Sequence, residues 1–370
     1  MSITNYFVRA TNGADVAGQG TTHMTAYQTP QFALDDIGAT HGRNTVDGDQ
    51  INICDSSLEG ANVLAAPLTL ATYGTPATTA PLILRGYTAV ANDGGMGEIN
   101  CGGATMWASS YNGMVHLDLN IHNGGTGHTV SLNQLVMLGC QVHEGAQGPT
   151  GANSLVSIGG GGLCAGNYIY GCAGRGVTAS LYCPVIGNYL DDIDRINIVC
   201  IWGHNNIVRL GAAGAEGIYI SGNGTISGNI VYNAVAGINY GLSMGPFASA
   251  FNNILVGFSG VGGKGIRFQN DVSMVGYNAF YNNIANYDPQ SYFSSADLTA
   301  HDVALAADPF VDAANGNFAL TDAAKLALRS AGWPASYLGA ATDPHITIGA
   351  VQYGEAGGGV IRRAMRMIGG

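Results

Sequence analysis

The chain has 370 residues, of which 10% are charged, and its 24 acidic and 13 basic side chains give a net charge of −11 at pH 7. This balance argues against a nucleic-acid partner, because a phosphate backbone is bound by clustered Lys and Arg. No run of about 18 apolar residues is present, so the sequence predicts no membrane insertion. The 57 glycines instead indicate a chain rich in turns and strands.

The first fifty residues predict a strand and a capping helix. Residues 6–9, Tyr-Phe-Val-Arg, read as the strand. In the helix, Thr29 is the expected N-cap, Pro30 the first position and Gly38 the stop. A repeating β fold needs its first layer covered, because an open β edge invites association. The N-terminus lacks a basic region followed by an apolar run, so we expect synthesis in the cytoplasm without a signal peptide.

A short phrase around asparagine recurs through the centre of the chain, as in Gly228-Asn229-Ile230-Val231. Successive markers are 21, 18, 23, 24 and 25 residues apart. The six markers are Asn167, Asn188, Asn206, Asn229, Asn253 and Asn278. A period of this length is typical of a leucine-rich repeat or a parallel β-helix, and the Leu-x-x-Leu-x-Leu frame of the former is missing.

The repeat therefore predicts an all-β fold, a parallel β-helix over residues 51–300. Equivalent positions of successive coils would stack about 4.8 Å apart. The six asparagines would then form one inward column in which amide hydrogen bonds pass from coil to coil. The alternative reading of the column is a polar binding groove.

Seven cysteines are present, and their spacing fits neither a disulfide framework nor a zinc site. Most lie in apolar strand contexts, so we expect buried thiols. They are Cys54, Cys101, Cys140, Cys164, Cys172, Cys183 and Cys200. We predict no metal and no cofactor.

The segment from Val115 to His122 alternates apolar and polar residues. If it is one continuous strand, His116, Asp118, Asn120 and His122 share one solvated face. A metal or sugar site on this face is the alternative interpretation.

The richest acidic cluster is Asp191, Asp192 and Asp194 beside Arg195, with His204, Arg209 and Glu216 further along. Paired carboxylates can hold calcium or act as the acid and base of a glycosidase. Asp191, Asp192, Asp194 and Arg195 are the candidate catalytic groups if the chain is an enzyme. A surface row of ion pairs explains the same pattern.

Tyrosines recur through the coils, and exposed members would suit carbohydrate stacking or a subunit interface. They are Tyr168, Tyr170, Tyr182, Tyr189, Tyr219, Tyr232 and Tyr240.

Residues 301–353 predict a short helix from Thr321 to Gly332 and a closing strand. Residues 354–370 are a Gly-rich spacer followed by a basic and apolar tail that carries Arg362, Arg363 and Arg366. Such a tail is a candidate docking segment that pairs with a neighbouring sheet, and disorder is the alternative.

Several motifs resemble those of right-handed parallel β-helix proteins of the pectate-lyase-like superfamily, especially members encoded among bacteriophage structural genes. The N-terminal motifs are Tyr-Phe-Val-Arg at 6–9 and Leu-Ile-Leu-Arg-Gly-Tyr at 82–87. Asp-Pro-Phe-Val at 308–311 and Ile-Gly-Ala-Val-Gln at 348–352 match near the other end. The resemblance specifies the fold better than the activity, because this fold carries lyases, hydrolases, adhesins and spikes.

In polygalacturonase-like relatives an Asp-Asp pair precedes Gly-His-Gly and then Arg-Ile-Lys. Here Asp191-Asp192 is followed by Arg195-Ile196-Asn197 and only then by Gly203-His204-Asn205. The resemblance therefore implies a non-enzymatic virion protein on a phage capsid or tail. The expected form is a homotrimer that contacts other virion proteins and binds a host surface glycan. A polysaccharide lyase or glycoside hydrolase acting on an acidic polysaccharide is the alternative.

Overall fold

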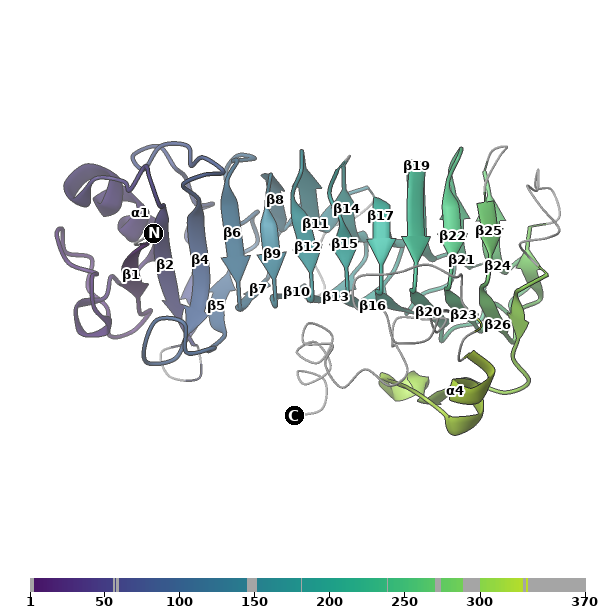
Figure 1. The fold of residues 1–370 in the computed structure, drawn as a ribbon. Coiled ribbons are helices and arrows are strands. Elements are labelled where there is room, and N and C mark those ends of the chain that lie inside the picture. Colours follow the sequence, from purple (N-terminus) through teal and green to yellow (C-terminus); the bar gives the residue numbers. More distant parts are fainter. Residues whose placement is uncertain are drawn as a thin grey trace. The chain divides into compact units, whose positions relative to one another are not determined.

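A computed structural model describes residues 3–55, 57, 60–144, 152–180, 182–237, 239–269, 274–288, 300–328 and 331. It divides into two compact units, residues 1–174 and 175–370, which we treat in turn (Figure 1). Both units consist of parallel strands stacked in successive coils, so the chain is an all-β parallel β-helix. Within the described residues, no helix is long and apolar enough to cross a bilayer.

The first unit builds its coils from three sets of parallel strands. One set is β1 (Thr4–Val8), β2 (Asp49–Cys54), β4 (Leu82–Tyr87), β6 (Met114–Leu117), β9 (Val136–Leu138) and β12 (Leu163–Ala165). A second is β8 (Val130–Asn133) with β11 (Ser154–Gly159). The third is β3 (Asn62–Val63), β5 (Gly97–Asn100), β7 (Leu119–His122), β10 (Gln141–His143) and β13 (Tyr168–Cys172).

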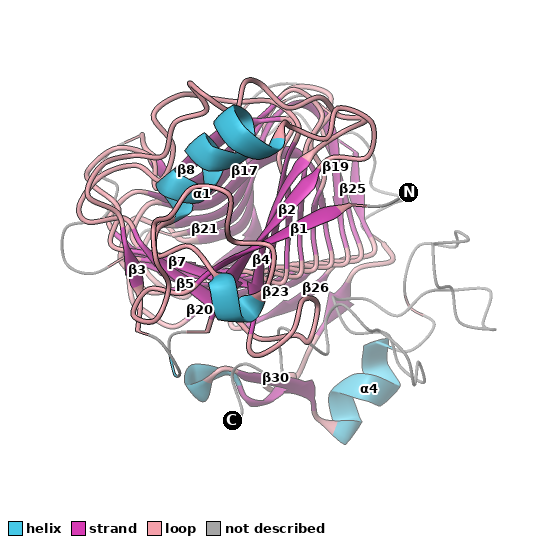
Figure 2. Ribbon diagram, turned by 90° about the vertical axis from the view of Figure 1, so that its left-hand side faces the viewer, coloured by secondary structure: helices cyan, strands magenta, loops and turns pink. Residues whose placement is uncertain are grey.

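The expected capping helix is present and packs on β1 and β2 (Figure 2). It comprises α1 (Pro30–Asp36) and a π turn (Ile37–His41), and a 3-10 turn (His23–Thr25) precedes it. Thr29 caps it by accepting a hydrogen bond from the Phe32 amide, 3.2 Å away. The predicted stop at Gly38 is wrong. A Cβ there would lie 2.4 Å from the Thr72 carbonyl oxygen, so Gly38 permits close packing rather than ending the helix.

The second unit builds its coils from three rows of parallel strands, the first two of which share one sheet through β17 and β19 (Figure 1). The first contains β14 (Arg175–Ala179), β17 (Ile196–His204), β19 (Glu216–Ser227), β21 (Tyr240–Met244), β24 (Lys264–Phe268) and β27 (Ala285–Tyr287). The second contains β15 (Val185–Ile186), the later parts of β17 and β19, β22 (Ser249–Phe251) and β25 (Met274–Gly276). The third contains β16 (Tyr189–Ile193), β18 (Ile207–Leu210), β20 (Ile230–Asn233), β23 (Ile254–Val256), β26 (Ala279–Tyr281) and β28 (Val303–Ala304).

A C-terminal segment follows the coils of the second unit. An antiparallel hairpin pairs β29 (Phe310–Asp312) with β30 (Asn317–Leu320) around a 3-10 turn (Ala313–Asn315). The helix α4 (Asp322–Leu328) comes next, and the Thr321 hydroxyl accepts from the Ala324 amide at its start. The parallel sheets extend past both expected ends of the solenoid, since β1 and β28 belong to them.

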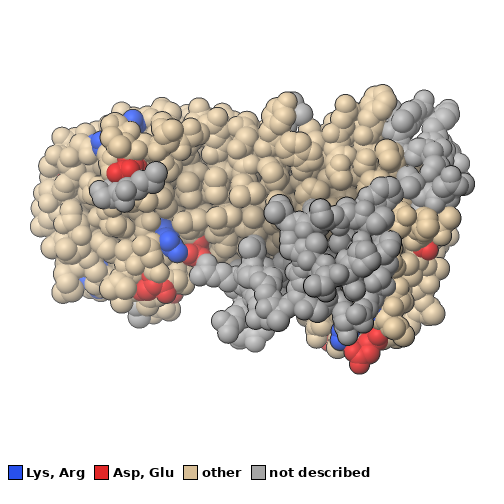
Figure 3. Space-filling model, viewed as in Figure 1, with Lys and Arg blue, Asp and Glu red and all other residues tan. Residues whose placement is uncertain are grey.

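Inward side chains of successive coils stack to make the core. Ile218, Leu242 and Ile266 lie in register on β19, β21 and β24, and none is exposed. All seven cysteines are buried thiols, as the sequence predicted. Charged side chains are sparse on the face that Figure 3 presents, so apolar burial rather than ion pairing stabilises the coils.

The marker asparagines of the second unit lie in one buried column. Each uses both its backbone N–H and its side-chain Nδ2 to donate to the Oδ1 of the asparagine one coil later. The distances are 2.9–3.0 Å for Asn188 to Asn206, Asn206 to Asn229, Asn229 to Asn253 and Asn253 to Asn278. In the first unit, Asn167 accepts from the Cys140 amide at 2.9 Å. Buried amides thus find partners without any loss of apolar core.

Candidate functional site

The first candidate catalytic residue, Asp191 on β16, has both carboxylate oxygens engaged. Arg209 lies opposite it on β18, and its Nε and Nη2 donate to Oδ1 and Oδ2 at 2.6 and 2.7 Å. The remaining Nη1 of Arg209 donates to the Ala314 carbonyl oxygen in the C-terminal hairpin. Asp191 is 7% exposed. A bidentate, half-enclosed pair of this kind holds the hairpin in place and engages both oxygens of the Asp191 carboxylate.

Aromatic rings close the hairpin over this ion pair. Phe318 of β30 meets the rings of Tyr189, Tyr232 and Phe310 with centroid separations of 5.9, 5.9 and 5.2 Å. These edge-on contacts place β30 against the outer side of β16 and β20. The Asp191 carboxylate is therefore part of a structural contact, beneath the segment that ends the described chain.

The other members of the acidic cluster do not converge with Asp191. Asp192, Asp194 and Arg195 are exposed, and Asp192 adopts a left-handed backbone with φ of +52°. Partial loss of hydration and the nearby Asp192 charge raise the pKa of Asp194. Among the described residues, no ion pair joins Arg195 to either carboxylate, and its carbonyl oxygen accepts a hydrogen bond from the Glu216 amide.

His204 and Glu216 have their own partners on other strands. His204 Nδ1 pairs with the Ser227 hydroxyl at 2.9 Å, and burial lowers the pKa of this histidine to about 4. Glu216 faces Arg267 at 3.4 Å. Within the described ranges, no group of three or more His, Cys, Asp or Glu side chains is arranged to hold a metal ion. The structure does not assemble an acid, a base and an ion site from these residues.

The predicted solvated face from His116 to His122 is wrong for its first histidine. The chain turns at Asp118, whose φ is +52°, so β6 and β7 belong to different sheets. His116 points into the core and is 0% exposed, and burial lowers its pKa to about 3. His122 stays on the outer side and pairs with Glu98 at 2.8 Å.

An outer row of rings runs across β7, β10 and β13. His122 stacks on His143 at 5.1 Å between centroids, and His143 stacks on Tyr170 at 4.6 Å. Tyr168 stacks on Tyr170 at 4.4 Å. His143 and Tyr170 each lie between two other rings, so both of their faces are covered. This row stabilises the sheet.

Open aromatic faces occur elsewhere, on the bend where β17 and β19 pass from one sheet to the next. Tyr182 is 68% exposed, Trp202 37% and Phe247 62%. Tyr182 and Trp202 meet edge to face with centroids 6.0 Å apart. Tyr182 and Phe247 have φ of +68° and +57°, which bulky residues rarely adopt. We call these three rings, together with residues 221–224, the aromatic corner.

Register fixes the order of the aromatic corner. Trp202 lies opposite Thr225 of β19, which lies opposite Ser249 of β22, two residues after Phe247. Trp202 and Phe247 are therefore two coils apart, about 10 Å along the stack. In the coil between them, residues 221–224, Ser-Gly-Asn-Gly, form a bulge that carries no aromatic ring.

Glycines let the intervening loop lie flat between the rings. A Cβ on Gly224 would lie 2.1 Å from the Ile201 carbonyl oxygen, and one on Gly245 would lie 2.5 Å from that of Ile220. Gly222 has open space where its Cβ would stand. Exposed Ser221 and Asn223 add hydrogen-bonding groups to this floor. The aromatic corner is thus a shallow uncharged surface with rings at two levels.

Sequence reasoning included Tyr182 among the recurring tyrosines but did not single out Trp202 or Phe247. Trp202 sits in an apolar strand sequence, and Phe247 follows Gly245-Pro246 in a loop. The Gly-Pro pair before an aromatic residue was the available signal, because it marks a turn that pushes the next side chain outward. The docking residues Arg362, Arg363 and Arg366 lie outside the described residues.

Comparison with known proteins places the fold. No protein-family model matches the chain, and no curated protein matches it. Among solved structures, pectate lyase Pel9A superposes with a TM-score of 0.58 at 13% identity, over 95% of this chain and 97% of that one. A deglycosylated pectin methylesterase from Aspergillus niger has a TM-score of 0.34 at 14% identity, over 80% and 91% of the two chains. The first likeness shows that the chain has a parallel β-helix fold similar to that of a pectate lyase.

Proposed function

We propose that this protein is a non-catalytic, carbohydrate-binding β-helix whose aromatic corner contacts the glycan. The observation that carries the proposal is the exposure of Tyr182, Trp202 and Phe247 on neighbouring coils. Two of these rings are held at strained backbone angles, which cost about 1–3 kcal/mol each and concentrate at functional sites. The apolar C–H faces of sugar rings pack on such aromatic faces, while Ser221 and Asn223 can bind hydroxyl groups.

The surroundings of the aromatic corner favour a glycan over a charged partner. Its neighbours in register, Thr225 and Ser249, are neutral and partly exposed. Rings about 10 Å apart along the stack would contact alternate units of an extended sugar chain. A subunit interface is the competing occupant, since exposed apolar patches also mark protein contacts.

We further propose, on the resemblance of the end motifs, that the protein is displayed on a bacteriophage capsid or tail as a homotrimer. It would be made in the host cytoplasm and would contact other virion proteins. The tail with Arg362, Arg363 and Arg366 is the proposed attachment segment. Mass spectrometry of purified virions would test this placement, and absence of the protein from particles would reject it.

The lyase or hydrolase alternative has weaker support. It needs Asp191, whose two oxygens are both bound by Arg209. It also needs Asp192, Asp194 and Arg195 to face one substrate, and no hydrogen bond or ion pair links their side chains among the described residues.

A glycan array with purified protein tests the binding proposal. We expect one glycan class to bind, and Trp202→Ala or Phe247→Ala to weaken it at least tenfold. Gly222→Val should do the same by raising a side chain between the rings, in space that is open in the fold. Val261→Ala is the matched control, because Val261 is 86% exposed in the same unit and lies outside the aromatic corner.

Two results would reject the glycan reading. One is binding that survives all three corner substitutions. The other is a wild-type protein that binds no glycan but self-associates, while Trp202→Ala is monomeric by light scattering. The second result would assign the aromatic corner to a subunit interface.

A further inference from the structure

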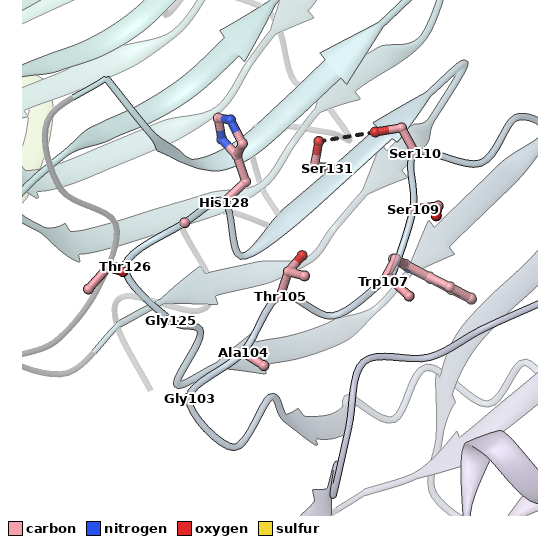
Figure 4. A pocket seen from close by; sticks show the side chains of 12 residues that line it. Gly103, Ala104, Thr105, Trp107, Ser109, Ser110, Gly125, Thr126, His128 and Ser131 are labelled. Atoms are coloured by element: carbon pink, nitrogen blue, oxygen red, sulfur yellow. Dashed lines mark hydrogen bonds between the residues drawn. The ribbon is translucent and has the colours of Figure 1, made fainter.

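A separate pocket opens in the first unit, between two loops of successive coils (Figure 4). Residues 103–110 connect β5 to β6, and residues 125–128 connect β7 to β8. The pocket has a volume of about 410 Å³. This volume falls within the range of about 300 to 1,000 Å³ that small-molecule sites occupy.

The lining of the pocket mixes polar and apolar groups and carries no acidic or basic residue apart from His128. Hydroxyl groups come from Thr105, Ser109, Ser110, Thr126 and Ser131, and the rest is mostly glycine and alanine. The Ser110 and Ser131 hydroxyls face each other at 3.5 Å, as Figure 4 shows. Hydroxyls both donate and accept, so such a wall can match hydroxyl groups of a ligand in several orientations.

His128 supplies a hydrogen-bond donor, and the ring nitrogen that carries the proton can be assigned. Its Nδ1 lies 3.0 Å from the Ser154 amide and accepts that N–H. A neutral imidazole that accepts at Nδ1 carries its proton on Nε2. In Figure 4 the His128 ring stands at the opposite end of the pocket from Trp107. The pocket therefore has one directed N–H donor beside its hydroxyls.

The Trp107 end of the pocket holds buried polar atoms without partners. Trp107 is 2% exposed, and its Nε1 has no hydrogen-bond acceptor among the described residues. Its indole ring stacks on His116 at 6.1 Å between centroids, and neither ring nitrogen of His116 has a partner in the same part of the chain. These atoms are enclosed in the core behind the Trp107 end, so the groups that can meet a ligand are the hydroxyls and His128.

Glycine leaves the mouth of the pocket open. A Cβ on Gly127 would meet no atom within 4 Å, and the backbone of Gly127 is not in the left-handed region. An alanine or valine would therefore fit at Gly127 without strain, but it would occupy ligand space. The glycine at position 127 therefore keeps space free at the pocket and is not required by the backbone conformation.

We propose that this pocket binds one neutral sugar ring, either free or at the end of a glycan. Hydroxyls and one N–H donor suit a polyhydroxylated ligand, whereas a carboxylate or ammonium group would lose its hydration with no opposite charge to meet it. The inference stands apart from the aromatic corner, since the two sites lie in different units and share no residue.

Saturation-transfer NMR and calorimetry with methyl glycosides of neutral hexoses test the proposal on the full chain. We expect at least one glycoside to bind in the millimolar range and the corresponding uronic acid to bind at least tenfold more weakly. Gly127→Val should abolish binding, and His128→Ala should weaken it at least fivefold. Thr79→Val, an exposed hydroxyl outside the pocket, should leave binding unchanged.

The outcomes separate this inference from the proposed function. Loss of glycoside binding in Gly127→Val with retention in Trp202→Ala supports the pocket. Loss only in Trp202→Ala assigns the ligand to the aromatic corner and overturns the pocket. Absence of binding for every glycoside, or equal binding by Gly127→Val protein with wild-type circular dichroism, also overturns it.

Discussion

The backbone N–H of Asn278 donates to Oδ1 of Asp302 at 2.9 Å, so a carboxylate occupies the last position of the asparagine column. Tyr287 donates its hydroxyl to the other oxygen, Oδ2. An aspartate at this place can accept from the coil before it and requires no acceptor from a coil beyond it. The asparagine column therefore ends at Asp302, which needs no further asparagine after it.

Asp302 should make the stability of the fold depend on pH. Burial raises the pKa of Asp302 to about 6, above its ordinary value. Between about pH 4 and 6, Asp302 keeps its proton in the folded state but has released it in the unfolded state. The stability that protonated Asp302 contributes is therefore present below pH 4 and is lost as the pH rises through 6. Asp302→Asn should be more stable than wild type at pH 7 by about 1–2 kcal/mol, after allowance for partial exposure.

Urea unfolding at pH 4, 5, 6 and 7 measures this difference. The stability difference between Asp302→Asn and wild type should shrink toward zero at pH 4. Asp192→Asn serves as control, because Asp192 is exposed. A difference between Asp302→Asn and wild type that is constant with pH would contradict the assignment.

Breaking the middle of the column should cost more than changing its end. Asn229→Leu removes the Oδ1 that accepts both the N–H and the Nδ2 of Asn206, and it leaves two buried donors unpaired. We expect a loss of about 3–5 kcal/mol of unfolding free energy. Asn223→Leu, at an exposed asparagine, should change stability by less than about 1 kcal/mol. Similar losses for the two variants would show that the column adds little.

The Asp191–Arg209 pair should hold the C-terminal hairpin to the coils. Arg209→Ala leaves the Asp191 carboxylate buried without its partner and removes the donor to Ala314. We expect a loss of about 2–3 kcal/mol and faster amide hydrogen exchange in residues 310–320. A double change of Asp191→Leu with Arg209→Met should lose less, because it leaves no unpaired charge. Unchanged exchange in the hairpin of Arg209→Ala would contradict this role.

Acidic polysaccharides should not be cleaved. The expectation follows from the bidentate pairing of Asp191 with Arg209 and from the separation of His204 and Glu216 onto partners of their own. Assays for unsaturated products and for reducing ends, with and without calcium, check it. Turnover that disappears in Asp192→Ala or Arg195→Ala would establish the enzyme alternative instead.

The proposed attachment tail can be removed without touching a described residue. Deleting residues 354–370 should leave the β circular dichroism unchanged. It should lower the oligomeric state in light scattering, or prevent incorporation into particles, because Arg362, Arg363 and Arg366 leave with the tail. A truncated protein that assembles and incorporates like the full chain would move the contact to the coils.

The fold was accessible from sequence because the phrase around Asn188, Asn206 and Asn229 marks the same turn in successive coils of the second unit. A buried amide column tolerates few substitutions, so its spacing survives loops of different length. The capping helix was also readable, from Thr29 and Pro30. The end of this helix could not be predicted from the sequence, because Gly38 meets the backbone near Thr72, and that contact joins segments distant in sequence.

The candidate sites were less accessible for the same reason. Nothing local shows that the ring of Tyr170 is covered by His143, whereas the ring of Trp202 is open. Alternation suggested that His116 faces water, but the left-handed turn at Asp118 starts a new sheet and sends His116 inward. Side-chain direction in a β-helix depends on where each coil bends, and bends arise from packing between coils.

The asparagine column has a direction, and that direction makes the two ends of the protein unequal for protein engineering. Every hydrogen bond between two asparagines of the column runs from the earlier coil to the later one, as in Asn206 to Asn229. Removing coils from the start of the second unit would leave one Oδ1 unfilled and one Nδ2 hydrogen without its carbonyl acceptor, as Asn206 would be without Val185. Removing them from the end would strand two N–H donors, unless the new last asparagine pairs with an aspartate set in the place of Asp302. A shortened solenoid should therefore be built by moving its aspartate inward, and a nascent chain would complete each amide only when the following coil emerges.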